Sequence, residues 1–267
     1  MRYTNYYPDS GMYHVSLPQL MGTRLDVLLF DDDHNHIINL WEDIESDIKR
    51  MEKMLNRFDH DSEVAKVNSD ALFSSAQLSD ELWDIVLDCK RYYELTEGCF
   101  DITLSDFGSV IFTEETHSIG FEKYGIKLDF GGYAKGYALK CVRKYLEDAE
   151  IKRALINFGN SSVLAMGTHP YGSNWPIGIE DPQNGSVMKT INLCDTSLSV
   201  SGNSPANKQH IINMSTSEYV AGDSLVAVVA DDPVDAEVLT TAWISSGKSD
   251  EPDWMKQFNL KNTYKIK

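Results

Sequence analysis

The chain has 267 residues and a mass of 30.1 kDa, which suffices for the core of one large domain or two small ones. Its 41 aspartates and glutamates exceed its 24 lysines and arginines, so the formal net charge is −17, and 42% of the residues are hydrophobic. This composition argues against a disordered or fibrous chain. So acidic a surface also repels phosphate backbones, which argues against nucleic acid as a partner.

No apolar run approaches the ~20 residues of a membrane-spanning helix, so we expect no transmembrane segment. The N-terminal residues contain neither the apolar core of a signal peptide nor a lipobox cysteine. The chain as it stands is therefore expected to be cytoplasmic. A periplasmic or membrane-anchored protein is the alternative if a leader has been removed.

Hydrophobic patterning in the first half predicts one strand followed by two helices. Residues 25–30 form an apolar run typical of a buried strand. Apolar residues then recur at alternating spacings of four and three, which places them on one helical face. The members of that face are Ile37, Trp41, Ile44, Ile48, Met51, Leu55 and Phe58. A second helix is predicted from Ser79 as N-cap to about Thr96, with Gly98 as its stop signal.

The second half is predicted to be mostly strand, after a loop-rich segment over residues 99–127 and a helix that opens at Gly131-Gly132. The expected strands are 154–158, 162–167, 175–180, 190–193, 197–202, 210–213 and 224–230. One more helix, from about Val234 to Ile244, follows Pro233. Because strands and helices mix without a regular βαβ repeat, we predict the α+β class rather than a doubly wound sheet.

One candidate site is the segment 128–136, where a strand end meets a glycine pair and then a helix. Free N–H groups at a helix start, with glycines that allow close approach, suit a phosphate. The segment matches neither the P-loop nor the Rossmann glycine motif. A tight turn before a helix explains the same residues without any ligand.

Two further groups suit catalysis or metal binding. Glu237 and Thr241 are four residues apart on a predicted helix, so a carboxylate and a hydroxyl face one way and suit Mg²⁺. Acidic residues favoured by the helix dipole are the alternative. His210 opens a strand after the Ser201-Gly202 turn and is either a general base or a structural histidine.

Taken together, these segments resemble the ApbE family, the FAD:protein FMN transferases, from residue 21 to about residue 245. The similar segments occur in the order that the family has. They are Met21-Gly22-Thr23, residues 58–68, residues 98–103 (GCFDIT), residues 128–137 (LDFGGYAKGY), residues 154–159 (ALINFG), residues 175–182 (WPIGIEDP), Ser201-Gly202, His210-Ile211-Ile212 and the helix at 236–242.

The resemblance implies a T-fold-like α+β architecture, with mixed or antiparallel sheets, flanking helices and FAD in a cleft between two lobes. It implies one domain over residues 1–267, with a lobe boundary near 125–150. It also implies a reaction in which Mg²⁺ bridges the FAD pyrophosphate, a Ser or Thr hydroxyl of a target protein attacks the FMN phosphorus, and AMP leaves.

The family's site residues carry over by position. Those that would line the FAD site are Met21, Phe58, Cys99, Phe100, Asp101, Asp129, Lys135 and Ile211. The metal would take a backbone carbonyl near Gly132 together with Glu237, which stands where the family usually has Asp, and Thr241. His210 matches the histidine proposed to deprotonate the acceptor hydroxyl.

The sequence contains no flavinylation motif of the form D-G-x-[ST]-G-A-[ST], so we expect the acceptor to be a separate protein. Two other functions remain open at this point. One is a flavin-binding protein without transferase activity. The other is an FAD pyrophosphatase that uses water as the acceptor and gives FMN and AMP.

Overall fold

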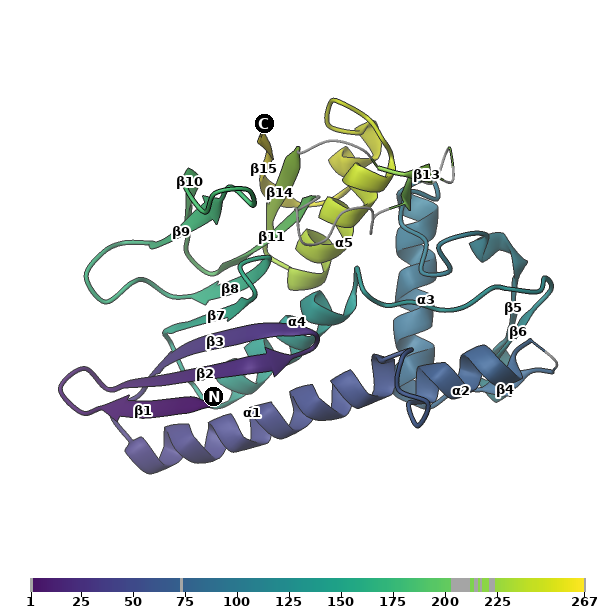
Figure 1. Ribbon diagram of the computed structural model, residues 1–267. Coiled ribbons are helices and arrows are strands. Elements are labelled where there is room, and N and C mark those ends of the chain that lie inside the picture. The colour runs from purple at the N-terminus through teal and green to yellow at the C-terminus, as the bar shows by residue number, and fades with distance from the viewer. Residues whose placement is uncertain are drawn as a thin grey trace.

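The computed structural model describes residues 2–72, 74–202, 212–213, 216, 218–220 and 224–266. Its main sheet has eight strands in the order β1-β2-β3-β7-β8-β11-β14-β15 (Figure 1), and each neighbouring pair is antiparallel. The strands are β1 Tyr3–Tyr7, β2 Met12–Leu20, β3 Thr23–Phe30, β7 Ala154–Phe158, β8 Ser162–Met166, β11 Thr196–Gly202, β14 Leu225–Ala230 and β15 Leu260–Ile266.

Three smaller sheets accompany the main one. The three-stranded sheet has the order β4-β6-β5, with β4 Ala76–Gln77, β5 Val110–Thr113 and β6 Ser118–Phe121. The two hairpins are β9 Trp175–Glu180 with β10 Val187–Leu193, and β12 Ile212–Asn213 with β13 Glu218–Tyr219. Short 3₁₀ turns lie at Phe107–Ser109, Glu114–Thr116 and Asp253–Gln257.

The helices of the described residues are α1 His34–Leu55, α2 Glu63–Asp70, α3 Asp80–Leu95, α4 Ala134–Asp148 and α5 Pro233–Ser245. The predicted N-cap of α3 is confirmed, because the Ser79 hydroxyl accepts a hydrogen bond from the Leu82 N–H. None of these helices combines the length and the apolar composition that crossing a bilayer requires. The mixture of an antiparallel sheet with separate helices confirms the α+β class.

Three apolar cores hold these layers together. The first lies between α1, α4 and the β1–β3 and β7–β8 part of the main sheet. The second joins α2, α3 and the three-stranded sheet to α5. The third lies under the β9–β10 hairpin, against β8, β11 and β14. In Figure 1 the three-stranded sheet stands at the end of the molecule away from β1, and α5 lies between it and the main sheet.

α5 is buried nearly all round because it has a neighbour on every side. Val238, Leu239 and Trp243 belong to the core shared with α3 and the small sheet. Glu237 and Thr240 contact hydroxyl groups of β8 and β11 instead. A helix that is apolar all round is expected in such a central position, so a buried acid on it requires partners.

The structure differs from the sequence expectations in several places. Residues 63–70 form α2, and the segment 99–127 contains β5 and β6. β1, β2 and β15 carry too many polar residues to stand out as buried runs. Phe58 does not belong to the α1 face, because α1 ends at Leu55 and the Phe58 side chain is 77% exposed. The single-domain assignment stays a prediction.

Candidate functional site

The loop that leads into α4 is fixed by hydrogen bonds to distant segments. The Asn68 side chain donates to the Leu128 carbonyl at 3.0 Å and accepts from the Leu128 N–H at 2.7 Å. The Asp129 N–H donates to the Ile102 carbonyl at 2.7 Å. These bonds explain how α2 and the GCFDIT segment hold the glycine pair in place at the start of α4.

Asp129 organises the turn itself. Its Oδ1 accepts from the Gly131 N–H at 2.8 Å, and its Oδ2 lies 2.9 Å from Arg57 Nε. The Arg57 guanidinium also lies over the Phe58 ring, 4.6 Å from its centre. The structure thus links Asp129 and Phe58, two predicted flavin-site residues, through an arginine that the sequence analysis did not select.

Gly132 lies directly against α5. A Cβ at this position would stand 3.0 Å from Thr241 Cγ2, 3.1 Å from Thr241 Oγ1 and 3.4 Å from the Phe100 ring. Three predicted site residues, from three separate segments, therefore meet at one point. A side chain in place of the glycine hydrogen would push α4 and α5 apart or displace Thr241.

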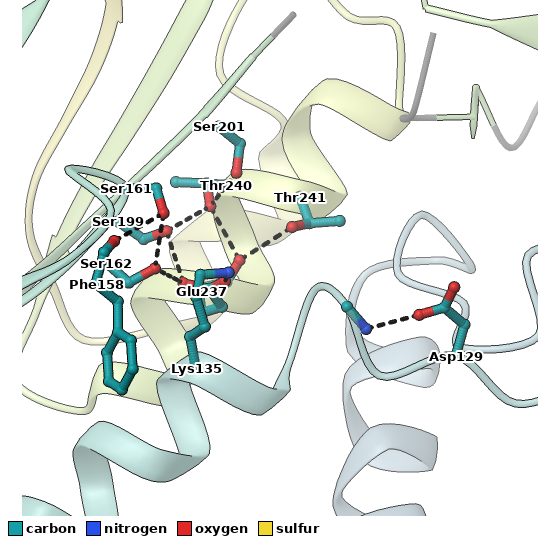
Figure 2. Close-up of polar contacts among 11 residues, drawn as sticks. Asp129, Lys135, Phe158, Ser161, Ser162, Ser199, Ser201, Glu237, Thr240 and Thr241 are labelled. Atoms are coloured by element: carbon teal, nitrogen blue, oxygen red, sulfur yellow. Dashed lines mark hydrogen bonds and ion pairs between the residues drawn. The ribbon is translucent and has the colours of Figure 1, made fainter. Parts of the chain in front are cut away.

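One turn further along α4, Lys135 pairs with Glu237 of α5 (Figure 2). The Lys135 ammonium contacts Glu237 Oε1, and the two side chains are 18% and 6% exposed. The close approach of the helices is made possible by Gly136, where a Cβ would stand 2.8 Å from Glu237 Cβ and 2.8 Å from the Pro233 carbonyl oxygen. Two predicted site residues are again brought together.

The other carboxylate oxygen of Glu237 accepts two hydroxyl hydrogen bonds. Ser162 Oγ of β8 donates at 2.5 Å and Ser199 Oγ of β11 at 3.1 Å, both to Oε2 (Figure 2). Ser199 also bonds Thr240 at 3.1 Å, and Ser201 donates to Thr240 at 2.9 Å. A buried charge that is paired and fully hydrogen-bonded avoids most of the cost of its burial.

The oxygen atoms at the α4–α5 junction have the chemistry that Mg²⁺ prefers. Mg²⁺ prefers oxygen ligands, usually one or two carboxylates with several waters. Glu237 supplies a buried carboxylate, and the Thr241 hydroxyl lies one turn along the same helix, bonded to the Glu237 carbonyl at 3.2 Å beside Gly132. Within the part of the chain that is described, no three His, Cys, Asp or Glu side chains cluster as metal ligands. These oxygen atoms fit Mg²⁺. In the structure the Lys135 ammonium contacts Oε1, the carboxylate oxygen at which such a cation would bind.

The Asp101 carboxylate accepts hydrogen bonds from within its own loop. Its Oδ1 accepts from the Thr103 N–H at 2.6 Å and the Thr103 hydroxyl at 2.7 Å, and its Oδ2 accepts from the Phe107 N–H at 3.2 Å. Burial raises the pKa of Asp101, and the donors of Thr103 and Phe107 offset part of that shift. The carboxylate therefore shapes the turn after Phe100, and its contact with a flavin stays a prediction.

Met21 and Cys99, two other predicted flavin-site residues, belong to separate loops. Met21 forms the turn between β2 and β3 with a φ of 50°, and it packs against the core of α1 and α4. Burial raises the pKa of the Cys99 thiol. The neighbouring Phe100 is buried, and its N–H donates a hydrogen bond to the Thr96 hydroxyl oxygen at 3.0 Å. His210 and Ile211 lie outside the described residues.

Sequence reasoning missed the contact of Ser162 and Ser199 with Glu237. A signal was present in β11, where Ser197, Ser199 and Ser201 alternate and therefore share one face of the strand. Such a polar face on a central strand predicts a polar neighbour across the layer. Nothing near Ser162 in the sequence gives a comparable signal.

Comparisons with known proteins show which family the chain is similar to. A sequence model of the ApbE family matches residues 21–264. The FAD:protein FMN transferase of Klebsiella pneumoniae (strain 342) is 29% identical over 148 residues, which are 52% of this chain and 45% of that protein. The protein of the same name from Rhodobacter capsulatus is 30% identical over 150 residues, 53% of this chain and 28% of that protein. The matched stretch is thus less than half of either curated relative.

A solved structure supports the fold over nearly the whole chain. The crystal structure of the ApbE protein from Thermotoga maritima superposes with a TM-score of 0.79 at 23% sequence identity. The match covers 92% of this chain and 89% of that one. The predicted ApbE-like architecture is therefore confirmed.

Proposed function

The chain belongs to the ApbE family, and on that premise we propose that it transfers FMN from FAD to a serine or threonine hydroxyl of another protein. The proposed reaction depends on Mg²⁺ and releases AMP. The observation that carries it is the junction of α4 with α5, where Gly132 meets Thr241 and Phe100, and Lys135 meets Glu237. A phosphate-binding helix start and an oxygen-rich cation site adjoin there.

The proposed roles follow from the chemistry of each group. The backbone at Gly132 and the first turn of α4 would receive the pyrophosphate of FAD, with Lys135 as a cationic side chain in that turn. Glu237, Thr241 and the Gly132 carbonyl would hold the metal. When bound, Mg²⁺ would offset the negative charge that phosphate oxygens carry in the transition state.

The step itself is a substitution at phosphorus. The acceptor oxygen forms a bond to the FMN phosphorus, the bond between that phosphorus and the bridging oxygen breaks, and AMP leaves with the electron pair. The acceptor hydroxyl loses a proton, and His210 is the proposed base. The acceptor protein is proposed to be a separate chain.

The test is a mass measurement. The protein is incubated with FAD, Mg²⁺ and a peptide that carries D-G-x-[ST]-G-A-[ST], and a matched peptide has alanine at both hydroxyl positions. We expect an FMN adduct on the first peptide only, lost when EDTA replaces Mg²⁺. FMN and AMP without an adduct would instead indicate a pyrophosphatase, and unchanged bound FAD a flavin-binding protein.

A further inference from the structure

The ion pair between Lys135 and Glu237 occupies the carboxylate that the proposed metal site needs. Oε2 is held by Ser162 and Ser199, and Oε1 contacts the Lys135 ammonium. Oε1 keeps a second lone pair, but a divalent cation bound there would be repelled by the neighbouring ammonium, so cation binding favours displacement of either the ammonium or the hydroxyl donors. The mechanism of the site depends on whether the hydroxyl groups or the ammonium leaves the carboxylate.

We propose that Lys135 is a displaceable counter-ion of Glu237. It holds the carboxylate in the ligand-free protein and gives up Oε1 to a divalent cation. Its ammonium then moves to a phosphate of the bound ligand. The second half of this exchange rests on the proposed function, which supplies the pyrophosphate. The first half concerns the protein and the cation alone.

The hydroxyl donors are the fixed partners. Ser162 and Ser199 are 1% and 2% exposed and belong to central strands of the main sheet, paired with each other across β8 and β11. Strand pairing fixes their backbones, so the hydroxyls can leave Oε2 only by rotation about χ1 within a buried layer. They orient the carboxylate so that Oε1, the other oxygen, is the one open to exchange. Ser162 and Ser199 are thus positioning residues.

Lys135 has the properties of a mobile partner. Its side chain has four rotatable bonds, starts in the first turn of α4 and is 18% exposed, three times the value for Glu237. The glycine pair that precedes α4 lies on the same side of the α4–α5 junction, because Gly132 and Gly136 both touch α5. A phosphate at the helix start would therefore lie within reach of the ammonium.

Electrostatics couples the two movements. Removing one partner of a buried ion pair leaves an uncompensated charge, which is strongly unfavourable. Departure of Lys135 from Glu237 is therefore unfavourable unless a cation replaces it, and repulsion by the ammonium weakens cation binding at Oε1. By linkage, the factor by which a bound cation favours the departure of Lys135 equals the factor by which the departure of Lys135 tightens cation binding.

The test measures cation binding in the absence of any flavin or acceptor. Mn²⁺, which also prefers carboxylate and carbonyl oxygens, serves as the probe. Its free concentration is followed by electron paramagnetic resonance in wild type, Lys135→Met and the control Lys140→Met. Lys140 lies on the same helix and pairs with Asp232 at 2.7 Å on the surface, so the control removes an equal charge.

We expect Lys135→Met to bind Mn²⁺ at least about tenfold more tightly than wild type, within the usual range of coupling between sites. Lys140→Met should stay within about twofold, and the gain should vanish in Lys135→Met with Glu237→Gln. Added Mn²⁺ should also raise the melting temperature of Lys135→Met more than that of wild type. Lys135→Gln, which keeps a hydrogen-bond donor, gives the same measurement if the methionine variant does not fold.

Unchanged or weaker Mn²⁺ binding by the Lys135 variants would overturn the proposal. So would a gain that survives Glu237→Gln, because the cation would then lie elsewhere. The outcome is separate from that of the proposed function. A protein that fails to transfer FMN can still show the exchange, and a working transferase can lack it.

Discussion

At the two ends of the strands of the main sheet, charged groups lie in different environments. At the end where β3 begins and β7 ends, the Glu237 side chain is 6% exposed and each of its carboxylate oxygens has a partner. At the end where β3 finishes and β7 begins, a cavity of about 650 Å³ opens. Its acidic and basic lining residues are Asp31, Asp32, His36, Glu150, Lys152 and Arg153.

The predicted site residues that the structure describes do not line this cavity. In the cavity, His36 Nδ1 lies 2.5 Å from Asp31 Oδ2, but the two side chains are 44% and 19% exposed and water screens them. At Glu237 water is largely excluded, so each interaction is stronger and each lost partner costs more. Under the proposed function, the reaction would take place at these buried charges rather than in the cavity.

The largest expected effect is the loss of the Glu237 charge. Glu237→Gln keeps the shape but removes the anionic ligand, so Mg²⁺-dependent FMN transfer should fall by at least about 10²-fold, as when one strong electrostatic group leaves an active site. Glu237→Asp should keep or raise activity, since Asp keeps the charge and is the residue that the resemblance to the family implies here. Transfer rates with saturating FAD provide the measurement.

Asp31→Asn, at the cavity end, is the matched control for Glu237→Gln. It also replaces a carboxylate by an amide but should leave the transfer rate within about twofold, because exposed pairs contribute little. Equal losses in the two variants would mean that the comparison between the ends is wrong. Full activity of Glu237→Gln would mean that the metal is held elsewhere or is not needed.

A second test breaks the contact between α4 and α5. Gly136→Ala places a methyl group 2.8 Å from the Pro233 carbonyl oxygen and 3.0 Å from Val234 Cα, which are backbone atoms that cannot rotate away. Overpacking of this kind typically costs about 1–3 kcal/mol. Urea unfolding of the variant should show this decrease in the free energy of unfolding.

Gly120→Ala is the control for the glycine test. A Cβ at Gly120 in β6 meets no atom within 4 Å, so the variant should be as stable as wild type or slightly more so. If Gly136→Ala were equally harmless, α4 and α5 would have room to separate. The tight pairing of Lys135 with Glu237 would then not be imposed by the helix packing.

The sequence predicted the parts of this fold that have a strong period or a clear cap. Ser79 and the alternating face of α1 are examples, because core burial and capping act on residues close in the chain. α2 was not predicted because only two of its residues, Val64 and Val67, are buried and most of the others are polar. β1 was not predicted because it is an edge strand whose residues are mostly exposed.

The candidate site was predictable only in part, for a related reason. The i, i+4 spacing of Glu237 and Thr241 is local, so the sequence could place both on one helix face. The partners of Glu237 come from α4, β8 and β11, 102, 75 and 38 residues away along the chain. Without the fold, no local pattern shows that Lys135 and Ser162 meet there.

The pH dependence of stability offers a smaller effect at the buried end. Burial raises the pKa of Asp235, and the Tyr92 hydroxyl, which donates at 2.6 Å, offsets only part of that shift. The folded protein therefore binds this proton more tightly than the unfolded chain, whose Asp pKa is about 3.9. Stability contributed by this group is lost as pH rises from about 4 through the raised pKa.

Asp235→Asn should remove that slope while the amide oxygen still accepts from Tyr92. Urea unfolding at a series of pH values should show that the variant loses less stability than wild type across this window. A steeper loss in the variant would mean that the charged form of Asp235 is the favoured one. The N-terminal turn of α5 would then stabilise it.

The smallest expected effect sharpens the comparison from the cavity end. His36→Gln removes the ring that pairs with Asp31 but leaves the backbone N–H of residue 36, which donates to the N-cap Asp33 at 3.1 Å. Only an exposed pair is lost, so the free energy of unfolding should fall by about 0.2–1 kcal/mol and FMN transfer should not change. Both quantities can be measured on one preparation. A large loss of activity would give the cavity a part in the reaction, and a large loss of stability would show that its charges are shielded from water as those around Glu237 are.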